Sequence, residues 1–122
     1  MAAKLDLKIE EIEPGRLQGQ LIATAKSRKA TVKFDVIEDL IPLSKGDRIV
    51  IEVREEKPSS LDKYVFCGHG YKVPSEKDGV DILSVWGIIF VFEPPIDLQA
   101  EKKYYICIYK REQKRRARKK TA

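Results

Sequence analysis

The stretch KYVFCGHGYKV, residues 63–73, combines strand-forming residues with two glycines at alternate positions, Gly68 and Gly70. Side chains two apart on a strand share a face, so Cys67 and His69 are expected on one face and the two glycines on the other. A glycine inside a strand permits a sharp bend or the close approach of another backbone. This stretch therefore predicts a bent strand in a small, closed sheet.

The segments around it also alternate apolar and polar residues, with Pro, Gly and Asp at the breaks, which is the pattern of half-buried strands. Glu13-Pro14-Gly15-Arg16 suits a type II turn, and residues 38–47 predict a packed loop with room for one helical turn. We expect seven strands, in the regions 5–13, 17–25, 31–37, 48–54, 63–73, 80–93 and 103–111. The region 80–93, VDILSVWGIIFVFE, is interpreted as one long strand bent at Gly87.

Short strands with glycines in their middles, and no long helix, indicate an all-β fold. The predicted architecture is a small closed antiparallel barrel resembling the OB-fold, because closure removes exposed strand edges. We place this barrel domain at residues 1–111. Residues 112–122 are expected to form a disordered or extended basic tail.

The net charge of +5 is concentrated at one end of the chain. Residues 110–122 carry eight Lys or Arg and one Glu, so the other 109 residues have a net charge of −2. A uniformly basic nucleic-acid-binding domain is therefore not indicated. The tail alone could contact phosphates or an acidic partner without sequence preference, through Lys114, Arg115, Arg116, Arg118, Lys119 and Lys120.

Cys67 and His69 are the residues with the most obvious chemistry, as a catalytic pair or as metal ligands. A cysteine nucleophile needs a positioned base, normally distant in sequence, and a zinc site needs more ligands than Cys67, His69 and Cys107 supply. We therefore expect no catalytic residue, no metal and no cofactor, and predict that both cysteines are reduced, packed thiols. The aromatic residues are similarly expected to pack in the core or at an interface rather than to stack on nucleic acid.

The sequence also restricts where the protein works. It contains no apolar run long enough for a membrane helix and no signal-peptide pattern, so we expect an intracellular, cytoplasmic protein with no membrane partner. It has no asparagine and is rich in Lys and Glu, a bias typical of hyperthermophiles.

Several phrases in fixed order resemble one family. They are EPGR at 13–16, VKFDVIEDLIPLSKGDRIVIEV at 32–53, YVFCGHGYKV at 64–73, ILSVWGIIFVFE at 82–93 and YYICIYKR at 104–111. Together they are similar to the eighth common subunit of eukaryotic nuclear RNA polymerases and its counterpart in archaeal DNA-directed RNA polymerase, the G subunit. The short loop EEKPSSLD at 55–62 and the basic tail suit an archaeal member.

The resemblance implies an accessory subunit of DNA-directed RNA polymerase, without catalytic residues or a small-molecule substrate. It implies docking on the largest subunit within the polymerase complex. By motif position, the residues expected to shape or contact that interface are Gly68, Tyr71, Lys72, Gly87, Lys110 and Arg111. The alternative is a stand-alone OB-fold protein that binds single-stranded nucleic acid through barrel aromatics.

Overall fold

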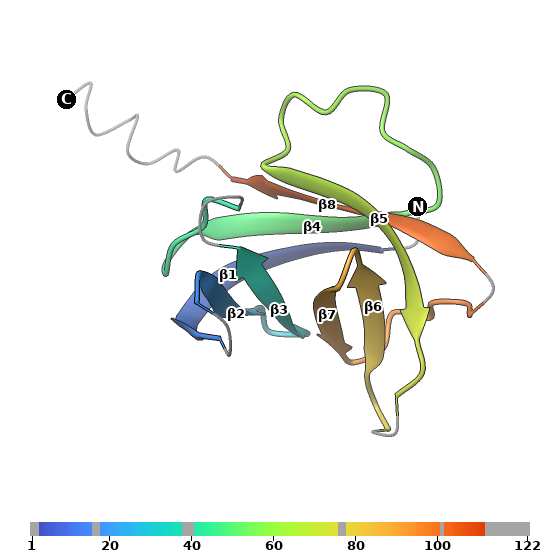
Figure 1. Ribbon diagram of the computed structural model, residues 1–122, viewed down its shortest axis with the longest axis horizontal. Coiled ribbons are helices and arrows are strands. Elements are labelled where there is room, and N and C mark those ends of the chain that lie inside the picture. Colours follow the sequence, from blue (N-terminus) through green and yellow to red (C-terminus); the bar gives the residue numbers. More distant parts are fainter. Residues whose placement is uncertain (1–2, 16–17, 38–40, 76–77, 101, 112–122) are drawn as a thin grey trace.

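The computed structural model describes residues 3–15, 18–37, 41–75, 78–100 and 102–111, which form eight strands and no helix (Figure 1). The strands are β1 (Ala3–Pro14), β2 (Gln20–Lys26), β3 (Thr31–Ile37), β4 (Arg48–Arg54), β5 (Phe66–Val73), β6 (Asp81–Val85), β7 (Ile88–Glu93) and β8 (Lys103–Lys110).

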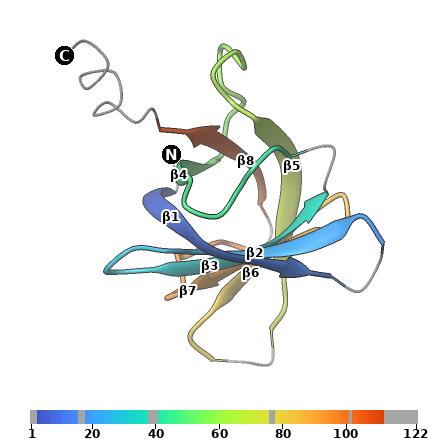
Figure 2. The same cartoon turned by 90° about the vertical axis from the view of Figure 1, so that its left-hand side faces the viewer.

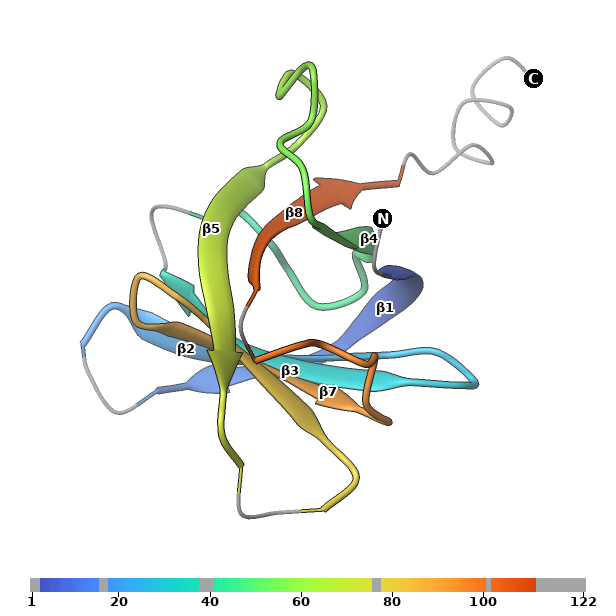
Figure 3. The ribbon, with the colours of Figure 1, turned by 90° about the vertical axis from the view of Figure 1, so that its right-hand side faces the viewer.

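The strands close into one antiparallel barrel in the order β1-β2-β3-β7-β6-β5-β8-β4, with β4 pairing back onto β1. β1, β2 and β3 form a meander, which Figure 2 shows along one side of the molecule. β5 runs long and curved across the opposite side, seen best in Figure 3. The predicted all-β, closed antiparallel barrel is therefore confirmed.

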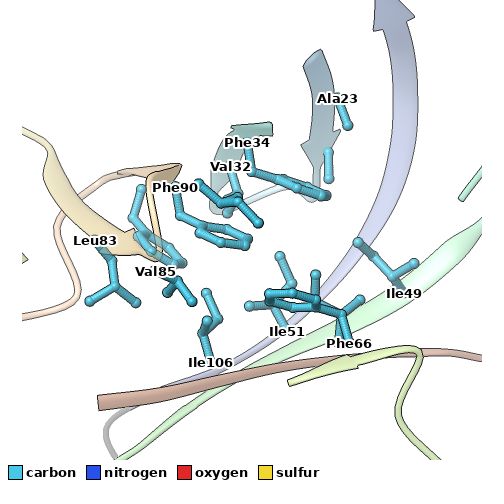
Figure 4. Close-up of a cluster of buried hydrophobic side chains, with 14 of the residues drawn as sticks. Ala23, Val32, Phe34, Ile49, Ile51, Phe66, Leu83, Val85, Phe90 and Ile106 are labelled. Atoms are coloured by element: carbon cyan, nitrogen blue, oxygen red, sulfur yellow. The ribbon is translucent and has the colours of Figure 1, made fainter. Parts of the chain in front are cut away.

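The barrel interior is filled by apolar side chains from every strand (Figure 4). The rings of Phe34 and Phe90 stack at 5.2 Å between centroids, and Tyr104 is also fully buried. Strands that present alternate residues inward explain the pattern, because the inward positions 49, 51 and 53 of β4 have no exposed surface. The aromatic packing expected for the core is confirmed at these residues.

The prediction of one bent strand over 80–93 was wrong, because this region is a tight hairpin. Trp86 and Gly87 connect β6 to β7, and both have a positive φ, 53° and 87°. Two central residues with positive φ are the mark of a type I′ turn, whose twist matches that of the flanking strands. The barrel has eight strands rather than seven for this reason.

The two predicted loops fall partly on residues outside those described. The type II turn at 13–16 includes Arg16, whose placement is not described. β1 extends to Pro14, and the Gly15 N–H donates to the Gln20 carbonyl to close the connection to β2. Of the loop 38–47, only 41–47 is described. It forms turns and no helix, and Ile41 and Leu43 pack in the core as expected for a packed loop.

The expectation of reduced cysteines was also wrong. Cys67 and Cys107 lie directly opposite each other on β5 and β8 and form a disulfide, with Cα atoms 4.1 Å apart. The spacing of 40 residues gave no sign of the bond, because the barrel topology alone brings these two strands together. Since both sulfurs are bonded, neither is available as a nucleophile or a metal ligand in this state.

The glycines of β5 allow the barrel to close. A Cβ on Gly70 would collide with the carbonyl oxygen of Ser84, and one on Gly68 with the Val85 side chain. At Gly70, next to the start of its pairing with β6, β5 therefore leaves no room for a side chain against the β6 backbone. The predicted bend or close approach is confirmed, and the approaching segment is a strand of the same chain.

Candidate interaction site

The outer face of β5 and β8 carries a short ladder of cross-strand pairs. Next to the disulfide, His69 lies opposite Tyr105, and their rings stack in parallel at 4.0 Å between centroids. Tyr71 lies opposite Lys103 one step further along. Cys67, His69 and Tyr71 therefore share the outer face, as the alternation of the sequence predicted.

Exposed apolar side chains gather beside this ladder. We define the Trp86 patch as Leu61, His69, Tyr71, Trp86 and Tyr105. Trp86, Tyr71 and Leu61 are 71%, 54% and 46% exposed, and among the described residues they are the large hydrophobic side chains left open to solvent. Isolated exposed apolar residues are ordinary, but a cluster indicates an interaction surface.

Two shallow cavities join the members of the patch. One, of about 200 Å³, is lined by Leu61, His69, Trp86 and Tyr105. The other, of about 340 Å³, is lined by His69, Tyr71, Trp86 and Gly87. Trp86 and His69 line both, so the patch is continuous. Its concave, aromatic character fits protein side chains, since aromatic residues are enriched at the centres of protein interfaces.

Trp86 occupies a backbone position that suits it poorly. Its φ of 53° lies in the left-handed region, which Asn, Asp and Gly tolerate and which costs other residues about 1–3 kcal/mol. Its only ring contact among the described residues is an edge contact with Phe66, at 6.2 Å. A strained and exposed indole adds little to folding, so its presence points to binding.

The sequence predicted Gly87 and Tyr71 as interface residues but did not single out Trp86, which was among the aromatic residues expected to pack in the core or at an interface. The sequence did contain some indication that Trp86 lies in a turn. Trp86-Gly87 stands between two apolar runs of strand length, and an X-Gly pair in that position is typical of a hairpin turn. A residue at the tip of such a turn is exposed.

Lys72 has an internal role. Its Nζ lies 3.4 Å from the Asp81 carboxylate and donates to the Leu98 carbonyl at 3.1 Å. Buried Asp81 also accepts the N–H groups of Ile96 and Leu98. Lys72 therefore helps to hold the segment 94–98 against β5 and β6. Gly68 is buried, so it shapes the barrel beneath the patch.

Lys110 and Arg111 lie at the other end of β8. Arg111 forms an ion pair with Asp6 at 2.7 Å, and Lys110 one with Asp47 at 3.5 Å. Lys103, opposite Tyr71, is seven residues from Lys110, which is roughly 23 Å along a strand. The structure thus brings Tyr71 and Gly87 together, with Gly68 below the patch, and separates Tyr71 from Lys110 and Arg111.

The remaining predicted contacts, Lys114 to Lys120, lie outside the described residues. Within the described ranges, no group of three or more His, Cys, Asp and Glu residues could hold a metal ion. No helix in the described part of the chain is long and apolar enough to cross a membrane.

Comparison with known proteins identifies the family. Residues 2–111 match the family model for the G subunit of DNA-directed RNA polymerase. The chain is also 29% identical, over 94 residues, to the DNA-directed RNA polymerase subunit Rpo8 of Saccharolobus solfataricus, with 70% of each chain covered. The family match covers every strand of the barrel. The chain therefore belongs to the family of DNA-directed RNA polymerase G subunits and is an accessory subunit of that transcription enzyme.

Proposed function

We propose that the Trp86 patch docks the chain on the largest subunit of an archaeal RNA polymerase. The polymerase complex as a whole is a nucleotidyltransferase, to which the barrel contributes binding surface and no catalytic group. The single observation that carries the proposal is Trp86, an indole held 71% exposed at a φ of 53°. We place the complex in the cytoplasm.

The patch has the chemistry of an interface centre. Trp and Tyr are the residues that most often dominate binding energy, because a large rigid ring loses little conformational entropy when it is buried. The disulfide and the stacked pair of His69 and Tyr105 fix the floor of the patch before binding. A preformed surface binds more tightly because less ordering is required on association.

Lys110 and Arg111 support docking less directly. Each already forms an ion pair within the chain, with Asp47 and Asp6 respectively. A partner would have to replace these surface pairs, and exchanging one surface pair for another changes the binding free energy little. We assign them to the rim of the interface or to the approach of the basic tail toward nucleic acid.

A capture experiment tests the proposal. The full chain carrying an affinity tag is incubated with the isolated largest subunit, and the bound complex is washed at low and high salt. Retention at high salt is expected, because an apolar, aromatic contact is not screened by ions. Loss of the largest subunit at moderate salt would contradict the proposal.

A further inference from the structure

A second concave site lies across the loop 55–65 from the Trp86 patch, and it differs from the patch in composition. The loop rises above β5 and β8 (Figure 1). The cavity has a volume of about 350 Å³ and is lined by Arg54, Pro58, Ser59, Ser60, Lys63 and Tyr64. Buried Pro58 also lines the small aromatic cavity of the patch, so it separates the two.

The polar groups of this cavity are nearly all hydrogen-bond donors. Arg54 brings a guanidinium and Lys63 an ammonium, and Ser59 and Ser60 bring hydroxyls. Ser60 Oγ already accepts the N–H of Asp62 at 3.3 Å, which leaves its own O–H free to donate. A cavity lined by donors from a strand end and a loop suits a ligand with several acceptor oxygens.

One of these donors, Arg54, is held in place by a buried carboxylate. Glu52 is 3% exposed, accepts the Tyr64 hydroxyl at 2.7 Å and pairs with Arg54 NH1 at 3.1 Å. Burial by itself would raise the pKa of Glu52, but the hydrogen bonds from Tyr64 and Arg54 and the charge of Lys63 outweigh it and lower the pKa. Glu52 thus remains ionised and balances one of the two cations.

Lys63 supplies the cation that Glu52 does not balance. Its Nζ lies 4.5 Å from the ring centroid of Tyr109 and 5.3 Å from that of Tyr64, so two cation–π contacts position the ammonium at the cavity. The other charges nearby are Lys57, Glu56 and Asp62 on the same loop, and Glu55, which is paired with Lys102 at 3.2 Å.

We propose that this cavity, formed by Arg54, Ser59, Ser60 and Lys63, binds a phosphate group, carried either by an RNA strand or by a free nucleotide. A phosphate suits the cavity better than a carboxylate does. A carboxylate has two oxygens in one plane and can meet fewer of these separate donors at once. A phosphate presents oxygens in several directions and can meet donors from Arg54, Lys63 and the serine loop together.

Nuclear magnetic resonance on the full-length, nitrogen-15-labelled chain tests this site directly. The three probes are inorganic phosphate, ATP and a short single-stranded oligouridylate. Each is expected to shift the amide signals of Ser59, Ser60 and Lys63 in a saturable way. Reading these signals, rather than total binding, separates the cavity from the basic segment 112–122, which would bind anions on its own.

Two lysine variants on one loop provide a matched comparison. Lys63→Gln should weaken phosphate binding about tenfold, the value expected for the loss of one charge-assisted hydrogen bond. Lys57→Gln removes the same charge from the same loop but lines the aromatic cavity, and should change the affinity less than about twofold. Both lysines are exposed, so both variants should keep the wild-type spectrum elsewhere.

The outcomes separate the sources of phosphate and the alternatives. Tighter saturation by the oligouridylate than by ATP, per phosphate, identifies an RNA backbone, and equal or weaker saturation identifies a free nucleotide. Three results would overturn the proposal. These are an absence of saturable shifts at Ser59 and Ser60, equal weakening by both lysine variants, and tighter binding of a glutamate-rich peptide than of any phosphate.

Discussion

The two ends of β8 are held in place by different kinds of interaction. From Lys103 to Cys107, the outer face is fixed by the stacked rings of His69 and Tyr105 and by the disulfide. The Lys110 end is held instead by two ion pairs, a half-buried one from Lys110 to Asp47 and an exposed one from Arg111 to Asp6. A surface that must bind by shape needs rigid support, whereas an end held by such ion pairs tolerates change. The Trp86 patch, and not the basic end, therefore has the character of a preformed site.

Removing the disulfide is expected to have the largest effect on folding. A bond that closes a loop between residues 40 apart in sequence should contribute about 2–4 kcal/mol to the free energy of unfolding. Chemical denaturation of the chain with and without a phosphine reductant measures this difference. A Cys67→Ala, Cys107→Ala double variant is the control, because its stability should not respond to the reductant. If the wild-type chain is equally insensitive, the rigid end does not depend on this bond.

Trp86→Asn separates binding from folding at the same end. Asparagine tolerates the positive φ of this turn, so the stability of the chain should stay the same or rise. Capture of the largest subunit should weaken by about 2 kcal/mol or more, which is roughly thirtyfold, because an interface-centre indole is lost. Binding is measured by calorimetry and stability by thermal melting. Unchanged affinity for the largest subunit would show that the docking surface lies outside the Trp86 patch.

Gly70→Ala tests the close backbone contact between β5 and β6. The added methyl group would meet the backbone carbonyl of Ser84, which cannot rotate away, so a loss of about 1–3 kcal/mol in unfolding free energy is expected. Gly68→Ala is the matched control, because it meets a side chain, that of Val85, and should cost less. Denaturant unfolding of both variants gives the comparison. A greater loss of unfolding free energy in Gly68→Ala would show that the contact of Gly70 with the Ser84 backbone is not the tighter of the two.

Arg111→Ala should have the smallest effect. The pair with Asp6 is exposed on both sides, so its removal should change the unfolding free energy by about 0–1 kcal/mol, and less in high salt. Capture of the largest subunit should fall no more than about threefold, as expected for a rim charge. A loss of affinity as large as that of Trp86→Asn would show that the Lys110 end contributes as much to docking as the Trp86 patch.

The alternation of apolar and polar residues predicted most of the strands. Those strands in turn predicted the barrel and its core. Strand β4 was predicted at its observed bounds because Arg48–Arg54 is a run rich in strand-forming apolar residues between two turn signals. The family resemblance, now confirmed, rested on ordered phrases that extend along the whole barrel. The sequence pattern was therefore sufficient for features that depend on residues close together in the chain.

What the sequence could not provide was decided by pairing between distant strands. Nothing near Cys67 indicates that Cys107 lies opposite, because that depends on the register of β5 against β8. Lys72 looks like a surface cation until the fold places Asp81 beside it. The turn at Trp86 was hidden by the residue type, since a tryptophan rarely occupies a position with positive φ.

The central claim is that the Trp86 patch is the surface buried in the polymerase, and oxidative footprinting of the assembled enzyme tests it most directly. Hydroxyl radicals oxidise exposed aromatic side chains, and mass spectrometry gives the rate at each one. Assembly should protect Trp86 and Tyr71, while acylation of Lys110, measured in parallel, should change much less. Oxidation of Trp86 at the same rate in the free chain and in the polymerase would contradict the account.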